Sequence, residues 1–396
     1  MSSKIKNIEI LELGEKGREI SSPWSSTILL VKLTTDDGLV GFGEAPTTLM
    51  TLPVKESMEE VKRFFQDKDF FNVEKNLREF YTHSFYLSKS MEATSALSAF
   101  EIASWDLIGK SLGAPIYNLL GGEVAKKHRA YANGWYSDCV TPDDFLAKAK
   151  KVVSQGFTAM KFDPFGDNYD QLSRKGLKNA VDIVSTLRNE LGDEVDLLIE
   201  CHGRFSLKAA IDAGTSLDPY EPLFMEEPLH PELEIGLLEL KKYVRTPIAL
   251  GERLLNKADF ARFISQGMVD IIQPDLTNSL GILENKKTAA IAEAFAIPVA
   301  FHNAFGPIQT AASLNVDTTL NNFLIQESFE AFWPDWKKNL VKSGYKLENG
   351  YFTLSGKPGL GIDVDEKILE SNAVEGMEPY DPKEPPWVVS GTFREA

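Results

Sequence analysis

The sequence predicts an α/β protein in which an N-terminal α+β domain precedes a TIM-like barrel of parallel strands and helices. The middle of the chain alternates short apolar runs with amphipathic stretches, which is the pattern of βα units. Polar residues also follow these runs at a nearly constant spacing, as expected where successive strands end at one rim of a barrel. At 396 residues the chain exceeds what one hydrophobic core usually covers, so two domains are expected.

Composition limits the classes of protein and of partner. Hydrophobic residues make up 43% and charged residues 25% of the chain, as in ordinary folded proteins. The longest apolar runs, such as residues 28–31 and 296–301, are far shorter than a bilayer span, and the N-terminus lacks a signal peptide's apolar stretch. A cytoplasmic location is therefore expected. The net charge of −16 argues against nucleic acid and anionic membranes as partners.

The two cysteines give no sign of a disulfide framework. Cys139 and Cys201 stand at neither a metal-binding nor a redox spacing. We expect both thiols to be reduced.

The first part of the chain is expected to be an antiparallel sheet followed by helices. Residues 4–12 and 26–45 alternate apolar and polar residues, with a turn at Asp36-Asp37-Gly38. From residue 54 to residue 120 the apolar residues recur at helical spacing, with Thr94-Ser95 as expected caps and Gly121-Gly122 as the expected stop. Together these patterns predict an α+β domain of roughly the first 125 residues.

The barrel is predicted from eight apolar runs and the polar residues that end them. The steps from Glu200 to Glu226 and from Glu226 to Glu252 are both 26 residues, and similar steps of 27 and 25 link Asp275, His302 and Glu327. One compact βα unit fits each step, so these side chains should meet at one mouth. The expected strands are residues 131–134, 159–162, 197–200, 223–225, 248–251, 271–273, 299–301 and 323–325.

The end of the chain predicts a hairpin and a returning tail. Asn349-Gly350 separates two short apolar runs, which is a strong hairpin signal. The proline-rich tail beyond residue 365, with Trp387-Val388-Val389, is expected to pack on the first domain.

Three carboxylates on three successive strands predict a metal site. Glu200, Glu226 and Glu252 would repel one another unless a cation lay among them, and oxygen-only ligands select a hard ion such as Mg²⁺. Each glutamate alone would more simply be a solvated loop residue, but three in register reverse that preference. Glu227, next to Glu226, is an alternative ligand that spacing does not distinguish.

Histidines at the same strand ends predict acid–base chemistry. His202 follows Glu200 by two residues, so both side chains share one face of the strand. His302 ends the seventh expected strand and Asp275 follows the sixth, so the carboxylate could hold one ring nitrogen and leave the other as a base. The remaining histidines, His83, His128 and His230, are interpreted as structural or surface residues.

Lys161 and Asp163 close the second expected strand. Their i, i+2 spacing places both side chains on one face, where the ammonium could help to hold an anion. A structural salt bridge between them is nearly as good an interpretation.

Several motifs, taken together, resemble one family. The segment Ala99–Lys110, followed by Pro115 and residues 119–122, is similar to the helix that leads into the barrel in the mandelate racemase branch of the enolase superfamily. Strand-end motifs of the same branch match in the same order, and they are Glu226-Glu227-Pro228, Gly251-Glu252-Arg253 and Gln273-Pro274-Asp275. The matches extend over nearly the whole chain.

The resemblance implies the architecture in more detail. It implies a (β/α)₇β barrel over residues 126–364 and a capping domain over residues 1–125 that is completed by residues 365–396. Loops near residues 17–25 and 46–53 would close on the substrate. Relatives often form dimers to octamers, so a homo-oligomer is implied.

The resemblance also implies roles at the strand ends. Glu200, Glu226 and Glu252 would bind one Mg²⁺ per subunit, with the first residue of the Glu226-Glu227 pair favoured. Asp275 with His302 matches the dyad base, and Glu327 matches the residue that hydrogen-bonds the substrate carboxylate. The chain departs from the branch in having Glu200 where Asp is frequent.

A second departure bears on the reaction. Racemases of this branch place Lys-x-Lys on the second strand, with the second lysine as a base, but this chain has Lys161 and Asp163. The segments 200–204, 131–135 and 301–306 are instead similar to gluconate and galactonate dehydratases, the archaeal gluconate dehydratases most of all.

The implied activity is an Mg²⁺-dependent dehydration of an aldonate, most of all D-gluconate, to a 2-keto-3-deoxy sugar acid. His302 would remove the C2 proton, Lys161 would help to stabilise the enediolate, and His202 would protonate the departing 3-hydroxyl. Substrate contacts are expected from Lys161, Glu327, Asn133 and Arg204.

Three alternatives stay open at this point. The substrate could be another aldonate, such as D-galactonate, D-xylonate or L-arabinonate. The chain could be a racemase or epimerase of a hydroxy acid, which would incorporate solvent deuterium without loss of water. It could also be a retired barrel that acts as a ligand-binding regulator.

Overall fold

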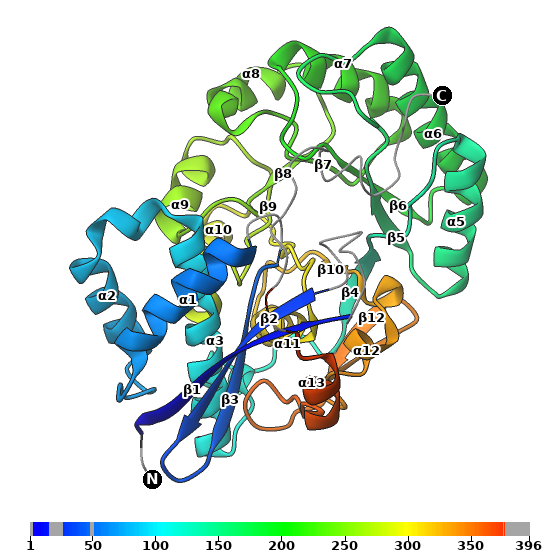
Figure 1. The fold of residues 1–396 in the computed structure, drawn as a ribbon. Coiled ribbons are helices and arrows are strands. Elements are labelled where there is room, and N and C mark those ends of the chain that lie inside the picture. Colours follow the sequence, from blue (N-terminus) through cyan, green and yellow to red (C-terminus); the bar gives the residue numbers. More distant parts are fainter. Residues whose placement is uncertain (1–2, 16–26, 48–50, 375, 377–396) are drawn as a thin grey trace.

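A small antiparallel sheet opens the chain. The computed structural model describes residues 3–15, 27–47, 51–374 and 376. Strands β1 (Ile5–Gly14), β2 (Thr27–Thr35) and β3 (Val40–Ala45) pair in sequence order, as Figure 1 shows in blue. The antiparallel start predicted from the alternating pattern is therefore confirmed.

Helices pack on one side of this sheet. The first, α1, is amphipathic and buries Val54, Met58, Val61 and Phe65, which recur at helical spacing. The helices of this region are α1 (Thr51–Phe65), α2 (Val73–His83), the 3₁₀ helix η1 (Phe85–Lys89), α3 (Met91–Leu112) and α4 (Ile116–Leu119).

The predicted start of the long helix is wrong, whereas the predicted stop at Gly121-Gly122 directly follows the short helix α4 that ends this helical region. Helix α3 begins at Met91, where the Ser90 hydroxyl accepts a hydrogen bond from the Ala93 N–H, and Thr94 and Ser95 lie buried inside the helix. The helix ends at Gly113, whose φ of 64° is the left-handed conformation that suits glycine. Because α3 is buried on nearly all sides, its sequence lacks the polar face that would have marked its start.

Helix α3 joins the small sheet to the barrel. On one side β3 lies so close that a Cβ on Gly43 would come within 1.8 Å of the Ala99 carbonyl oxygen. On the other side the buried Glu101 carboxylate accepts hydrogen bonds from the N–H groups of Ile282 and Leu283, at 2.7 and 2.9 Å. One helix therefore supplies the core of the first domain and a wall of the second.

A closed ring of parallel strands forms the second domain. Strands pair in the order β4 to β9, and β10 pairs with β4. Single bridges from Ile272 to Val299 and from Val299 to Phe323 close the gap between β9 and β10. The strands are β4 (His128–Ala132), β5 (Ala159–Phe162), β6 (Asp196–Glu200), β7 (Phe224–Glu226), β8 (Ile248–Leu250), β9 (Ile271–Ile272) and β10 (Gln326–Ser328).

The interior of the ring is a packed layer of side chains. Each of the eight segments predicted as strands contributes one buried residue to it, and bulky and small side chains both occur. A filled interior is typical of barrels of this size, and it leaves the rim as the place for chemistry. The layer consists of Tyr131, Ala159, Leu198, Phe224, Ala249, Ile271, Ala300 and Ile325.

The last two predicted strands differ from those observed. Residues 299–301 form only the single bridges of Val299, and the eighth strand is Gln326–Ser328 instead of residues 323–325. The apolar run Phe323 to Ile325 matched the strand pattern, whereas the residues that pair with β4 are polar. The burial of Gln326 is partly compensated, because its side-chain amide donates to the carbonyl groups of Phe301 and Glu327.

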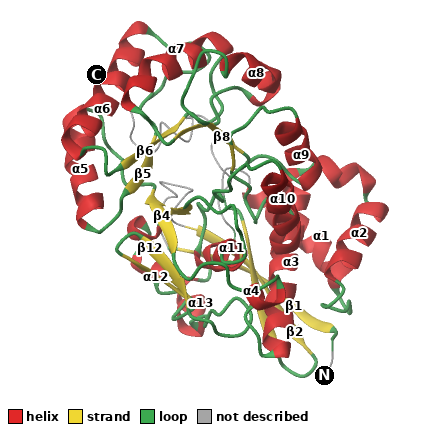
Figure 2. Cartoon of the chain, turned by 180° about the vertical axis from the view of Figure 1, so that it is seen from behind, coloured by secondary structure: helices red, strands yellow, loops and turns green. Residues whose placement is uncertain are grey.

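Helices surround the ring, as both ribbon views show (Figure 1, Figure 2). Sequence signals at their starts are clear in several cases: α5 opens with a Thr141–Asp144 capping box and a proline at its first position. The helices are α5 (Pro142–Ser154), α6 (Arg174–Leu191), α7 (Leu207–Leu217), η2 (Asp218–Tyr220), η3 (Pro231–Gly236), α8 (Leu237–Leu240), α9 (Lys257–Ser265), α10 (Gly281–Ala294), α11 (Pro307–Asp317), η4 (Glu330–Phe332) and α12 (Asp335–Lys338).

The C-terminal segment contains the predicted hairpin. Strands β11 (Tyr345–Glu348) and β12 (Tyr351–Leu354) pair through a turn in which Asn349 and Gly350 have φ of 52° and 73°. Helix α13 (Glu366–Asn372) follows, and the Val374 N–H bonds to the Glu12 carbonyl of β1. The rest of the tail, with Trp387-Val388-Val389, lies outside the described residues, as do the whole predicted loop at 17–25 and residues 48–50 of the one at 46–53.

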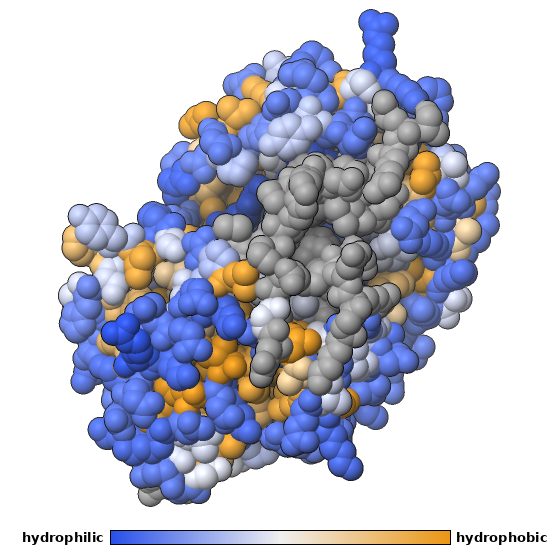
Figure 3. All heavy atoms as spheres, viewed as in Figure 1, coloured by the Kyte–Doolittle hydropathy of each residue, from blue (hydrophilic) through white to orange (hydrophobic). Residues whose placement is uncertain are grey.

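The surface and the cysteines are those of an ordinary folded protein. Most of the described surface in Figure 3 is hydrophilic, with hydrophobic patches over the lower part, where the small sheet lies. Cys139 and Cys201 are both free, as predicted, and both are buried. Within the described part of the chain, no helix is long and apolar enough to cross a membrane.

His128 predicts a pH dependence of stability that is separate from activity. It is buried at the start of β4, where Nε2 contacts the Thr318 hydroxyl at 3.0 Å, and burial lowers its pKa to about 4. Because the unfolded chain binds this proton near pH 6.5, stability is full above that pH and is lost as the pH falls. Between pH 7.5 and 5 the loss should be about 2 kcal/mol.

The matched variant is His128→Gln, which can still bond to Thr318 but does not titrate. Urea unfolding at both pH values should show a loss about 2 kcal/mol larger for the wild type than for the variant. Equal losses in the two proteins would contradict this prediction.

Candidate active site

The barrel mouth gathers carboxylates around one lysine. Lys161 ends β5, and its Nζ lies 3.0 Å from Glu200 Oε2, 2.5 Å from Glu226 Oε1 and 3.0 Å from Glu327 Oε1. Glu200 and Glu226 end the neighbouring strands β6 and β7, whose register sets them opposite each other, and Glu327 lies on β10. None of the four residues is more than 3% exposed. The predicted meeting of strand-end residues is therefore observed for these four.

The charges in this cluster shift one another's pKa. Burial alone would lower the pKa of Lys161, but Glu226 and Glu327 outweigh it and raise the pKa well above its ordinary value. Burial, together with the charge of Glu200, raises the pKa of Glu226 well above its usual range. The cluster thus has an excess of negative charge that Lys161 does not balance.

His202 lies beside this cluster and is held by Asp163. Its Nδ1 is 2.8 Å from Asp163 Oδ2, and the Arg204 guanidinium donates to Asp163 Oδ1 at 2.6 Å. Burial opposes the charged imidazole, but Glu200 and Asp163 together raise the pKa of His202. His202 also has a φ of 51°, an uncommon conformation for a residue other than glycine, in the turn that follows β6. Asp163, which the sequence left unassigned, is thus the partner of this histidine.

His302 is held by the other predicted residue, Asp275. Its Nδ1 lies 2.6 Å from Asp275 Oδ2, and its Nε2 faces Glu252 Oε2 at 3.2 Å and Glu327 Oε2 at 3.9 Å. Burial alone would lower the pKa of His302, but the neighbouring carboxylates, Glu252 first among them, raise it to about 10. The predicted dyad is therefore formed, with Nε2 toward the other carboxylates.

Glu327 is fixed from two sides. Asn133 Nδ2 donates to Glu327 Oε1 at 2.8 Å, and the Asn303 N–H donates to Oε2 at the same distance. Asn133 was predicted to contact the substrate, and its observed contact is with Glu327. Arg204, predicted for the same role, is fully buried and bonds to Asp163. Substrate binding by both residues stays a prediction.

The two adjacent glutamates of the Glu226-Glu227 pair point to different partners. Glu226 faces Lys161 and also accepts a hydrogen bond from Gln273 Nε2 at 2.5 Å. Glu227 forms an ion pair with Arg253 and accepts from the Gly251 N–H. This difference favours Glu226 over Glu227 as the group available to a metal.

The predicted metal ligands are only partly gathered. Glu200 and Glu226 adjoin each other at Lys161, whereas Glu252 is turned to His302. In the described part of the chain, no three histidine, cysteine or carboxylate side chains stand in ready metal-binding geometry. The Lys161 ammonium and the His302 ring occupy the places between the carboxylates.

The donor set nevertheless fits a hard divalent cation. Among the described residues, five carboxylates form ion pairs with Lys161 or His302. The negative charge of these carboxylates exceeds the positive charge of the two cationic groups. Oxygen donors of this kind select Mg²⁺ over softer ions. A dication near Glu252 would also weaken the field that raises the pKa of His302. The role of Glu200, Glu226 and Glu252 as ligands stays a prediction.

The sequence analysis missed several supporting residues. Gln273 stands inside a motif that was noted but was given no role, and Asn303 directly follows His302. Their positions next to predicted site residues were the only indication of a role that the sequence offered. Gln309 and Thr277 also bond to Asp275, and no spacing pointed to Gln309.

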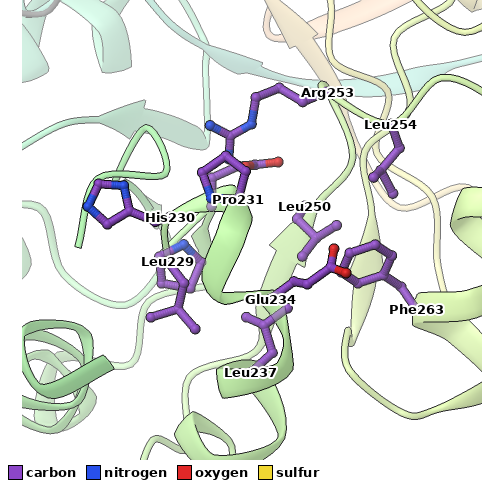
Figure 4. A pocket seen from close by; sticks show the side chains of 11 residues that line it. Leu229, His230, Pro231, Glu234, Leu237, Leu250, Arg253, Leu254 and Phe263 are labelled. Atoms are coloured by element: carbon purple, nitrogen blue, oxygen red, sulfur yellow. The ribbon is translucent and has the colours of Figure 1, made fainter. Parts of the chain in front are cut away.

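A small cavity lies beside the site, behind the Glu227–Arg253 ion pair (Figure 4). Its volume is about 100 Å³, and four leucines and Phe263 contribute to its lining. Its polar groups are paired: His230 with Asp170, and Glu234 with Arg262. The cavity therefore contributes none of the chemistry described above.

Comparison with known families identifies the family to which the chain belongs. Residues 20–121 match the family model described as mandelate racemase/muconate lactonizing enzyme, N-terminal domain, and residues 144–368 match the one described as enolase C-terminal domain-like. A capping domain and an α/β barrel with acidic strand ends define this class of enzymes. The chain therefore belongs to the mandelate racemase/muconate lactonizing enzyme family within the enolase superfamily, and the resemblance noted in the sequence is confirmed.

Individual relatives are similar over nearly the full length of this chain. The D-gluconate/D-galactonate dehydratase of Picrophilus torridus is 68% identical over 98% of this chain and 99% of its own. The D-gluconate dehydratase of Thermoproteus tenax is 40% identical over 98% of this chain and 78% of its own.

Solved structures share the whole fold. A mandelate racemase/muconate lactonizing enzyme from Sulfitobacter sp. superposes with a TM-score of 0.88 at 30% identity and covers 96% of this chain and 98% of its own. One from Jannaschia sp. CCS1 gives 0.86 at 28% identity, with 95% and 99% covered. The predicted capping domain and barrel are thus confirmed as the fold class.

Proposed function

We propose that this chain is a sugar-acid dehydratase, a hydro-lyase that converts D-gluconate, and also D-galactonate, into a 2-keto-3-deoxy sugar acid and water. One observation carries the mechanism: two histidines, each bonded to its own aspartate, follow the third and seventh strands of a closed ring of eight. Such positions lie across the mouth from each other. Burial raises the pKa of Glu252 and the charges of both imidazoles lower it, so Glu252 lies within electrostatic reach of both histidines.

His302 is the base of this proposal. Asp275 accepts the hydrogen bond from Nδ1, which fixes the ring and leaves Nε2 to take a proton. Nε2 faces the Glu252 and Glu327 side of the mouth. The proton it removes is the one on C2, next to the substrate carboxylate.

His202 is the acid. Asp163 and Glu200 favour its protonated form, so it can supply a proton near neutral pH. It donates that proton to the departing 3-hydroxyl, and the enol then becomes the 2-keto product. Placing the acid and the base in separate environments lets both act at one pH.

The substrate carboxylate is held by charge. Lys161 lies at the centre of the mouth and would contact the anion directly, with Glu327 as a hydrogen-bond partner. Glu200, Glu226 and Glu252 would hold Mg²⁺, which supplies the positive charge that stabilises the negative charge developing on the carboxylate.

The choice of dehydration over racemisation rests on Asp163. Racemases of the family carry a second lysine base at this strand position, but here Asp163 is an acceptor bonded to His202, Arg204 and the Phe165 N–H. The choice of substrate rests on relatives: that from Picrophilus torridus is named for both acids, and that from Thermoproteus tenax for D-gluconate.

The test is turnover on a panel of aldonates. Purified protein with Mg²⁺ should release a 2-keto-3-deoxy acid from D-gluconate and D-galactonate, with less or none from D-xylonate and L-arabinonate. EDTA should abolish the activity and excess Mg²⁺ should restore it. No product from any member would refute the proposal, and deuterium exchange without loss of water would favour the racemase alternative.

A further inference from the structure

Gln309 is a buried amide whose two ends are both engaged. It stands in the first turn of α11, with no exposed surface. Its Oε1 accepts from the Phe305 N–H at 2.9 Å, and its Nε2 donates to Asp275 Oδ2 at 3.0 Å. Because the Phe305 N–H can only donate, the amide has one possible orientation, with its NH₂ group toward Asp275.

This amide completes the hydrogen bonding of the Asp275 carboxylate. Oδ1 accepts from the N–H and the hydroxyl of Thr277, at 2.7 and 2.6 Å. Oδ2 is shared between Gln309 Nε2 and His302 Nδ1. With both oxygens engaged, the carboxylate has no freedom to rotate away from the imidazole.

The capping domain in turn fixes the position of Gln309. Glu44 at the end of β3 is fully buried, and its Oε2 accepts from the N–H groups of Ile308 and Gln309, at 3.1 and 2.9 Å. Those groups are the unpaired donors at the start of α11, where the helix dipole also favours an anion. A Cβ on Gly306 would come within 2.3 Å of Glu44 Oε1, so the glycine leaves room for this contact.

We propose that Gln309 is a positioning residue for the His302–Asp275 dyad, and that Glu44 of the capping domain holds Gln309 in place. The inference rests on the proposed role of the dyad as the C2 base. Gln309 does not touch the reacting atoms; it keeps Asp275 where it can orient His302. Glu44 lies 265 positions before Gln309, in the other domain, and it influences the position of the base through its hydrogen bonds to the first turn of α11.

The test separates proton removal from folding and binding. Gln309→Leu removes the side-chain hydrogen bonds to the Phe305 N–H, to Asp275 and to the His302 carbonyl. Gln309→Glu keeps the acceptor for Phe305 but replaces the donor to Asp275 with an oxygen. Both should lower kcat for D-gluconate about 10- to 100-fold, as removing a partner that orients a functional histidine does in metal sites. KM should change less than threefold. The isotope effect on kcat with C2-deuterated gluconate should rise, because proton removal becomes slower than the other steps.

Glu44→Gln and Asn315→Leu complete the design. Burial raises the pKa of Glu44 to about 7, so its carboxyl group is only partly charged near neutral pH. Glu44→Gln removes that charge but keeps an acceptor, so kcat should fall by less, about three- to tenfold, with the same rise in the isotope effect. Asn315 is a buried amide on the same helix that bonds to the Tyr117 N–H and the Ala311 carbonyl, away from the dyad. Asn315→Leu should lower the melting temperature without changing the isotope effect.

The outcomes distinguish this inference from the proposed function. A wild type that neither dehydrates aldonates nor exchanges the C2 proton removes the base role, and this inference with it. A wild type that does both, while Gln309→Leu and Gln309→Glu stay within twofold in kcat, overturns the role of Gln309 alone. A loss of kcat with an unchanged isotope effect also overturns it, since that is the behaviour of a purely structural residue.

Discussion

His302→Asn should lower kcat for aldonate dehydration by about 10³- to 10⁴-fold, the upper range for loss of a general base. Asparagine keeps a polar group beside Asp275 but cannot take the C2 proton. Exchange of that proton with solvent deuterium should disappear together with product formation. Both can be measured in one experiment, by NMR of D-gluconate incubated with enzyme and Mg²⁺ in D₂O.

The control for this variant is His230→Asn. His230 also pairs with an aspartate, Asp170, at 2.5 Å, but it lies outside the carboxylate cluster. Its loss should leave kcat within twofold. If His302→Asn retained more than a tenth of the wild-type kcat, His302 would not be the base.

His202→Asn should separate the two halves of the reaction. Product formation should fall by about 10²- to 10³-fold, because the 3-hydroxyl then leaves without a positioned acid. His302 and Asp275 remain in place, so C2 exchange should continue at a rate near that of the wild type. The recovered gluconate should therefore become deuterated at C2 while little 2-keto-3-deoxy acid accumulates.

The opposite behaviour of the two histidine variants is the decisive comparison. Loss of both exchange and elimination in His202→Asn would mean that His202 takes part in proton removal or in holding the site together. In that case a melting curve of the variant tells the two apart, since only the second explanation requires a lower melting temperature.

The sequence predicted the parts of the fold that have a periodic signal. Strand ends were found because a polar residue follows each apolar run, and the 26-residue step from Glu200 to Glu226 joins two carboxylates that both contact Lys161. The eighth strand was misplaced because Gln326–Ser328 is polar although it is buried. The start of α3 was misplaced because a helix buried on nearly all sides has no polar face to mark it.

The site was predicted as a set of residues but not as a network. Nothing local to Asp163 showed that it would bind His202 and not Lys161, because that choice depends on the turn at His202 with its positive φ. The contact of Glu44 with α11 joins residues in different domains, and neither segment alone carries a sign of it. Spacing shows which side chains share a rim; it does not show which of them pair.

The position of α3 limits how members of this family can be recombined. One face of the helix packs closely against Gly43 of the small sheet. Its Glu101 accepts hydrogen bonds from the first turn of α10 in the barrel. A chimaera that borrows only the sheet and the loops of a relative would graft them onto a helix shaped for other neighbours. Helix α3 and the loop before α10 would have to be transplanted together with the sheet, as a single unit of exchange.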